Sequence, residues 1–326
     1  MKFPRLLFVL GLLFPLGVMA SPTDDARDWL SRMSRAAHAL NYEGTFVYEH
    51  MGSMQSMRIF HGADAGGERE RLVTLDGASR EVIRDNDKVT CILPDDKAVV
   101  VDATGPSRPF PLNLPTRLEQ LGEYYDAEVG GTDRVAGHTA QKIIIRPRDG
   151  YRYGQNVWLE QDTALLLKSE LVDEDGKAVE RLMFTTLEVH AGALPPSLFE
   201  PQNTGADMVW YTRDPEAMAD AQASTAQHWR VEKLPPGFRH DVRRFHSVPA
   251  TLRPVEHLVY SDGLASVSVF IEQQSGENAF TGSSRKGAVH VYAREHDGYS
   301  ILVIGEVPAA TVRLIGDSVM RTEQAP

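Results

Sequence analysis

The fold is decided by the stretch YEGTFVYEHMGSMQSMRIFH, residues 42–61, which predicts two β-strands joined by a tight turn. Phe46 and Tyr48 alternate with polar neighbours, and Met57 and Ile59 repeat the alternation after the turn. A period of two is typical of half-buried strands, so one apolar face of this hairpin is expected to point inward. The hairpin therefore predicts the start of a large antiparallel sheet with an apolar inner face.

The same pattern recurs along the chain and predicts two domains. Strands are expected over residues 69–75, 79–84, 88–93, 98–102, 141–146, 154–160, 165–172 and 177–189, and in a second domain over 229–233, 238–246, 255–260, 264–272, 288–294 and 299–304. Helices are expected over 24–40, near 116–125 and from Pro308, the last with Val312, Ile315 and Val319 on its inner face. The fold class is mainly β within α+β: a large unclosed antiparallel β-barrel wrapped on helices, plus a smaller α+β domain.

The chain of 326 residues is long enough for two cores. Lys2 and Arg5 precede a short apolar run that ends in Val-Met-Ala20, which predicts a signal peptide over residues 1–20 and export to the periplasm. A half-barrel domain is expected over 21–200, a linker over 201–227 and a small α+β domain over 228–326. The run is too short to span a bilayer, and a net charge of -11 argues against a nucleic-acid partner.

The apolar inner face of the larger domain is the first candidate site. About nine strands with only two helices leave more apolar face than the helices can cover, so the sheet is expected to keep a cavity for an acyl chain or an apolar peptide. The alternative is that each of these side chains is ordinary core. The predicted cavity residues are Phe46, Tyr48, Met57, Ile59, Leu72, Val82 and Ile92.

A basic segment in the smaller domain is the second candidate site. Residues 229–257 carry a net charge of +3 in an otherwise acidic chain. Arginine side chains bind carboxylates and phosphates in a bidentate manner, so this segment could bind an acidic partner or a phosphorylated lipid headgroup. A charged solvent face on an edge strand is an equally good interpretation. The predicted partner- or phosphate-binding residues are Arg239, Arg243, Arg244 and Arg253.

Sequence motifs for catalysis, metals or cofactors are absent. His240 and His246, like His290 and His296, are six residues apart in strand-like sequence, about 20 Å at about 3.3 Å per residue, so they cannot share an ion within a strand. The chain has no Gly-x-Ser-x-Gly elbow and no phosphate-binding glycine loop. Its single cysteine, Cys91, lies among apolar residues and suits a packed thiol. No enzyme activity, metal or cofactor is expected.

Several segments together resemble one protein family. They are Tyr42–Tyr48, the REVIR segment at 80–84, the WLEQDTA and LKSELV segments within 158–172, and GEVPAATV at 305–312. In combination they look like the RseB/MucB-type periplasmic regulators of an envelope-stress sigma factor, over the whole chain after residue 20. The larger domain is also similar to the LolA/LolB lipoprotein carriers.

The resemblance implies a protein that is not an enzyme. Such a regulator binds the periplasmic part of a membrane-spanning anti-sigma factor and shields it from a site-one protease. A lipid signal such as lipopolysaccharide releases it, and family members tend to form homo-oligomers. A lipid or lipoprotein carrier remains the alternative function, and a hydrolase would need a reactive pair that the sequence does not show.

Overall fold

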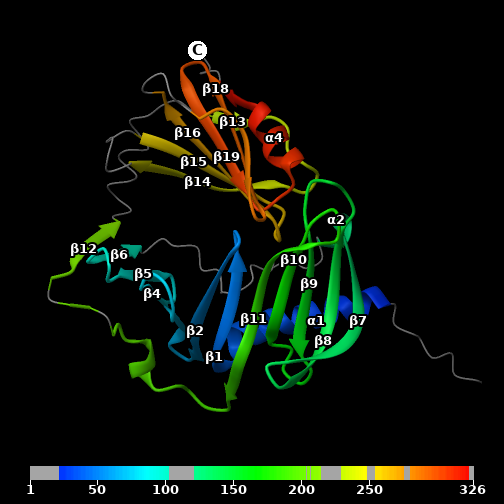
Figure 1. Ribbon diagram of the computed structural model, residues 1–326, viewed down its shortest axis with the longest axis vertical. Helices are drawn as coiled ribbons and strands as arrows, with labels where there is room; N and C mark the ends of the chain where they lie inside the picture. The colour runs from blue at the N-terminus through cyan, green and yellow to red at the C-terminus, as the bar shows by residue number, and fades with distance from the viewer. Residues whose placement is uncertain are drawn as a thin grey trace, which may run out of the picture.

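The computed structural model describes residues 22–102, 121–202, 204–205, 207–213, 229–247, 254–274 and 280–322. Outside the described residues therefore lie the expected signal peptide, Arg253, and the part of the helix expected near 116–125 that precedes residue 121. Figure 1 shows two bodies, with the larger sheet and helix α1 below and the smaller domain with helix α4 above.

The larger domain is built on one sheet of twelve strands. The strands are β1 (Asn41–His50), β2 (Ser53–Asp64), β3 (Gly67–Thr74), β4 (Glu81–Asp85), β5 (Lys88–Leu93), β6 (Ala98–Asp102), β7 (Tyr125–Val135), β8 (His138–Pro147), β9 (Gly154–Glu160), β10 (Leu166–Val172), β11 (Ala178–His190) and β12 (Val209–Arg213). Their order is β12-β6-β5-β4-β3-β2-β1-β11-β10-β9-β8-β7. The short elements α2 (Leu121–Tyr124) and η2 (Pro196–Phe199) accompany this sheet.

The predicted hairpin of residues 42–61 is confirmed as β1 and β2. Phe46 lies opposite Met57, and Gly44 lies opposite Ile59. The turn between the strands contains Met51 and Gly52, both with positive φ, as tight hairpin turns require. Because directly opposed residues share a face, the apolar side chains of the two strands point to the same side of the sheet.

Helix α1 (Pro22–Ala39) covers the inner face of the β7–β11 half of the sheet, behind the strands in Figure 1. Its apolar stripe is buried: Ala26 and Leu30 are fully covered and pack with Ile143 and Leu159. Near the end of the helix, Ala36 joins a second cluster under the opening hairpin. Apolar residues three and four apart place one helix face on the sheet, as the sequence pattern predicts.

The description of this domain as a barrel needs correction. β12 and β7 are the two edges of the sheet, and no ladder between described strands joins them. The chain is mainly β with few helices, as expected, but the sheet is open and curved. Its helix packs on one side of the sheet and is not enclosed by it, because the edge strands β12 and β7 lie far apart (Figure 1).

The smaller domain contains a six-stranded and a two-stranded sheet. The strands are β13 (Trp229–Val231), β14 (Arg239–Ser247), β15 (Pro254–Ser261), β16 (Ser266–Gln273), β17 (Gly282–Lys286), β18 (Val289–His296), β19 (Tyr299–Gly305) and β20 (Val319–Arg321). The six-stranded sheet has the order β14-β15-β16-β19-β18-β17, and β13 pairs with β20. Helix α4 (Ala309–Asp317) packs on β18 and β19 through Val312 and Ile315.

Three features differ from the sequence expectations. β12 lies inside the stretch 201–227 that was expected to be a linker, and it pairs in parallel with β6. Val319 is not on the closing helix, because the helix ends at Asp317 and Val319 begins β20. Strands β7 and β17 have no counterpart in the expected set, although both are paired in their sheets.

Candidate binding site at the domain interface

The predicted cavity residues of the larger domain fall into two groups. Phe46 and Ile59 are fully buried and pack in the cluster that includes Ala36 of α1, so the helix covers them. Tyr48, Met57 and Leu72 lie at the edge of the same cluster and are partly exposed. The helix therefore fills the hollow next to the opening hairpin and leaves its margin accessible.

The last two predicted cavity residues lie on opposite faces of the sheet. Val82 is opposite Leu72 and Cys91, on the same face as Ile59. Ile92 is opposite Glu81 and packs with Ile83 and Val99 on the other face. The prediction that Ile92 lines the same surface as the other six is wrong, because neighbouring residues of a strand point to opposite sides.

The predicted basic residues lie on one strand as far as the structure describes them. Arg239 begins β14 and is exposed. Arg243 and Arg244 occupy successive positions of β14, opposite Leu258 and His257 of β15. Their role as contacts for a partner or a phosphate stays a prediction.

The two domains are joined by a buried charged side chain that the sequence analysis did not single out. Arg152, in the loop between β8 and β9, places Nη1 2.8 Å from Oδ2 of Asp262 in the β15–β16 turn, and both side chains have no exposed surface. Its Nε donates to Asp149 at 3.1 Å, and its guanidinium lies 4.9 Å from the ring centre of Tyr124. The Tyr125 hydroxyl donates to the same Asp262 oxygen at 2.9 Å.

Asp262 is positioned for this contact by its own turn. Its Oδ1 accepts hydrogen bonds from the backbone N–H groups of Leu264 and Ala265, at 2.9 and 2.8 Å. This Asx-type turn leaves Oδ2 free to face the larger domain. A buried ion pair whose remaining polar atoms are bonded is tolerated in a protein interior, and we call the Arg152–Asp262 pair the anchor of the interface.

Further contacts connect the domains beyond the anchor. The Thr311 hydroxyl of α4 donates to the backbone oxygen of Tyr151 at 2.6 Å. The Tyr153 hydroxyl lies 3.2 Å from Nδ1 of His290 in β18. The turn after β17 reaches the opening hairpin at Gly287, whose φ is +59° and whose Cα has no room for a Cβ beside the Met51 backbone.

A cavity of about 320 Å³ lies between the domains. Its walls include Tyr153, Gln155 and Leu171 of the larger domain and Ser266, Ile304 and Glu306 of the smaller one. Gln155 lies opposite Leu171, and Leu171 lies opposite Glu180, so one row of the larger sheet forms the floor. The Gln155 Oε1 atom is buried and has no hydrogen-bond partner among the described residues.

A histidine and two glutamates meet at one side of this cavity. Nδ1 of His50, at the end of β1, lies 2.8 Å from Oε2 of Glu180 in β11 and 3.7 Å from Oε1 of Glu306, which follows β19. Burial and the neighbouring Glu180 carboxylate, partly opposed by His50, together raise the pKa of Glu306 to about 7. Burial and the same two glutamates also raise the pKa of the Tyr48 hydroxyl well above its usual range.

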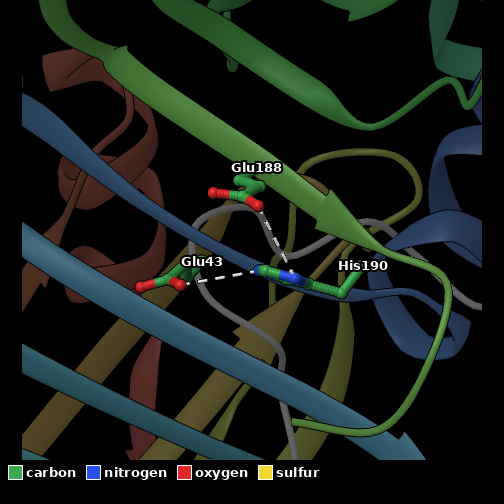
Figure 2. Close-up of side chains that lie close together, drawn as sticks. All are labelled: Glu43, Glu188 and His190. Carbon is green, nitrogen blue, oxygen red and sulfur yellow. Dashed lines mark ion pairs between the residues drawn. The ribbon is translucent and has the colours of Figure 1, made fainter.

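A second histidine with two glutamates lies at the other end of the β1–β11 pair (Figure 2). Oε1 of Glu43 lies 3.5 Å from Nε2 of His190, and Oε1 of Glu188 lies 3.8 Å from its Nδ1. The imidazole ring therefore lies between the two carboxylates, which approach different ring nitrogens. A metal ion binds one ring nitrogen, so the arrangement suits an ion-paired ring better than a metal centre.

The remaining candidate from the sequence, Cys91, has a structural role. Burial raises the pKa of the Cys91 thiol, so the unreactive protonated form is favoured, in line with a packed cysteine. No helix in the described part of the chain is long and apolar enough to cross a membrane.

Among the described residues, the best-formed site is the interface between the domains. The fold and this interface define a class: a two-domain, mainly β protein suited to binding.

The chain belongs to the MucB/RseB family. The MucB/RseB N-terminal domain matches residues 25–205, and the MucB/RseB C-terminal domain matches residues 223–320. The sigma factor AlgU regulatory protein MucB of Pseudomonas aeruginosa is 37% identical over 325 residues, with 98% of each chain covered. The sigma-E factor regulatory protein RseB of Haemophilus influenzae is 27% identical, with 96% of this chain and 97% of that protein covered.

A solved structure gives the same relationship in three dimensions. The complex of MucA and MucB from Pseudomonas aeruginosa contains a chain that matches with a TM-score of 0.73 and 33% identity, covering 92% of this chain and 100% of that one. The family suggested by the sequence segments is thus confirmed. The anchor residues and the His50 cluster were missed by sequence reasoning, because single charged residues in turns have no signature that distinguishes them from a solvated surface.

Proposed function

We propose that this chain is a periplasmic negative regulator that binds the periplasmic region of an anti-sigma factor and shields it from site-one proteolysis. The observation that carries the proposal is the similarity of both domains, over 98% of the chain, to MucB. MucB has been solved in complex with MucA and with a fragment designated MucA(peri). The partner of this chain is accordingly expected to be the periplasmic part of a membrane protein.

A lipid signal is proposed to release the partner. The partly exposed side chains of Tyr48, Met57, Leu72 and Val82 share one face of the sheet and offer an apolar surface at the margin of the filled core. Burying about ten methylenes at about 0.8 kcal/mol each gives about 8 kcal/mol before ordering costs, similar to a micromolar contact. Lipid binding could therefore displace a partner, provided that the lipid prefers the partner-free form. Self-association is proposed on family resemblance alone.

The partner proposal is tested with the periplasmic region of a transmembrane anti-sigma factor from the same organism. Calorimetry should show a complex, and the complex should be cleaved more slowly by the site-one protease than the free region. Arg243→Glu with Arg244→Glu should weaken binding of the partner or of lipid several-fold, whereas Arg134→Glu, an exposed change in β7, should not. Absence of a complex with the unaltered chain would refute the proposed function.

The lipid proposal has a matched pair of variants. Leu72→Ser removes an apolar side chain from the proposed surface, while Leu75→Ser changes an exposed leucine three residues further along. Lipid should bind several-fold more weakly to the first variant and unchanged to the second. Equal binding by both variants would exclude this surface. Capture of lipoproteins without any anti-sigma factor would favour the carrier function, which would leave the match of the smaller domain unexplained.

A further inference from the structure

Two polar contacts between the domains differ in the charges that they bring together. The anchor pairs a fully buried arginine with a fully buried aspartate, so it holds opposite charges together. The His50 cluster instead brings two carboxyl groups, Glu180 and Glu306, to the same imidazole nitrogen. One carboxyl group belongs to each domain, and like charges that close together oppose each other unless a proton or a cation lies between them.

We propose that His50, Glu180 and Glu306 form a proton-dependent latch that holds the smaller domain against the larger one and opens when the shared proton is lost. His50 Nδ1 donates to Glu180 at 2.8 Å, so the imidazole satisfies the carboxylate of the larger domain. A protonated Glu306 can then donate its own hydrogen to the pair, whereas an ionised Glu306 brings a second negative charge to the interface.

The surroundings of Glu306 contain few groups that could neutralise it. From β1 it is faced by His50 and the Tyr48 hydroxyl, and from β11 by Glu180. Across the cavity, its walls contribute the neutral side chains of Tyr125, Tyr153 and Gln155. Arg181, the neighbour of Glu180 in β11, bonds Glu49 and Glu170 instead. Arg285 of β17 donates to the Gly287 backbone oxygen at 2.9 Å and pairs with Asp173 at 3.8 Å.

The direction of the pH effect follows from the raised pKa of Glu306, about 7 against an ordinary carboxyl value. The docked form binds the proton more tightly than the open form, so docking is most favourable below the ordinary glutamate pKa of about 4.3. It weakens as the pH rises from there toward 7. Above pH 7 both forms have lost the proton, and the docked form keeps the full repulsion between the two carboxylates.

The geometry also predicts how the domains separate. The anchor and the contact of Thr311 with Tyr151 lie on the Arg152 loop, while the latch lies at the end of β1 and at the start of β11. The cavity occupies the space between these two places. Opening of the latch with the anchor intact should therefore widen the cavity and expose the buried Oε1 of Gln155.

A distance measurement tests the latch in the whole protein. Spin labels at Thr132→Cys in β7 and Ser284→Cys in β17, both exposed positions, report the separation of the domains in a Cys91→Ser background. Pulsed electron–electron double resonance in buffers with EDTA should give one narrow distribution of distances between the two labels at pH 5.5. At pH 8.5 the distance should be longer or its distribution at least twice as broad, with the change largely complete by about pH 7.

Substitutions at the latch separate it from general pH effects. Glu306→Gln keeps the size and hydrogen-bonding of a protonated glutamate, so the distance should stay short at both pH values. Glu188→Gln, an exposed change on β11 outside the latch, should leave the transition unchanged. A wild-type distance that does not change with pH would overturn the proposal. A transition with the same midpoint in Glu306→Gln would overturn it as well.

Discussion

Arg152 carries more of the domain interface than any other single side chain that the structure describes. Its guanidinium contacts Asp149 of its own loop, Asp262 of the smaller domain and the backbone oxygen of Pro236. Charges without exposed surface are costly unless they are paired, and removing one partner leaves the other charge buried alone. Such a substitution should therefore destabilise both the contact between the domains and the folded protein as a whole.

We therefore expect Arg152→Leu to lower the free energy of unfolding by about 3–5 kcal/mol, because Asp262 is left buried without its cation. Urea denaturation at pH 7 measures the change. Arg148→Leu is the matched control, since Arg148 pairs with Asp126 at the surface and its loss should have little effect. Equal losses for the two variants would mean that Asp262 finds another partner or water.

Gly44 allows β11 to approach β1 closely. A Cβ at this position would lie 2.6 Å from the backbone oxygen of Thr186 and 2.8 Å from the ring of Phe184. Gly44→Ala should therefore cost about 1–3 kcal/mol, because the core must shift to make room. Thermal unfolding measures it, with Gly131→Ala as control, a site with open space around it. An unchanged melting temperature for Gly44→Ala would show that the strands can separate at no cost.

Alternation along the sequence identified which side chains point inward but could not relate the faces of different strands. Phe46 and Ile59 were placed correctly because the hairpin register follows directly from its short turn. Ile92 was placed on the wrong face because its register depends on three further turns after the hairpin, each able to shift the pairing by one residue. Glu306 was not singled out as a functional residue, because only docking of the domains places it beside His50 and Glu180.

At the level of elements, the sequence predicted most of the strands that carry buried apolar side chains. β17 was missed because every one of its residues is exposed, so the segment contains no apolar period. β7 was missed because Gly130 and Gly131 interrupt it where its register with β8 shifts. β12 was taken for linker because five residues that pair in parallel with a distant strand carry no local turn signal.

Strands β2, β3 and β4 are connected on one face by a polar network centred on Glu68. Its carboxylate accepts hydrogen bonds from His61 at 3.1 Å, His38 at 3.0 Å and Arg84 at 2.7 Å. Burial alone would raise the pKa of Glu68, but these three bonds outweigh it and hold the pKa well below its usual range. The folded state therefore favours the ionised carboxylate.

The lowered pKa of Glu68 makes stability fall in acid. Its contribution is complete above the ordinary glutamate pKa of about 4.3 and is lost as the pH falls below it. We expect Glu68→Gln to lower the free energy of unfolding at pH 7 and to narrow its difference from wild type at pH 3.5. Urea unfolding at both pH values measures this, with the exposed Glu128→Gln as control. A difference in free energy of unfolding between the variant and wild type that grows in acid would contradict the lowered pKa of Glu68.

Over the whole molecule, the two domains have separate apolar cores. Among the residues that the structure describes, one cluster is confined to the smaller domain, and the clusters of the larger domain receive from the other side only the partly buried Leu264. The relative position of the domains therefore depends on directional polar contacts. A protein joined in this way can change the angle between its domains at modest cost, as the release by a signal proposed above requires.

The contact between α4 and the Arg152 loop offers a test of this dependence. Thr311 is fully buried, and its hydroxyl donates to the Tyr151 backbone oxygen at 2.6 Å. Thr311→Val keeps the shape but removes the donor, so it should destabilise the protein by about 1–3 kcal/mol and broaden the distance distribution between spin labels on the two domains. Both effects would be read at pH 5.5, where the latch is expected to be closed.

Thr311→Ser is the matched control, because it retains the hydroxyl and loses only a methyl group. If hydrogen bonds position the smaller domain, the serine variant should keep a narrow distance distribution, although the lost methyl lowers its stability slightly. If apolar packing of Val312 and Ile315 alone positions α4, the valine variant should behave like wild type and the serine variant should be the weaker one. Which of the two variants is less stable and gives the broader distance distribution thus decides which kind of contact sets the angle between the domains.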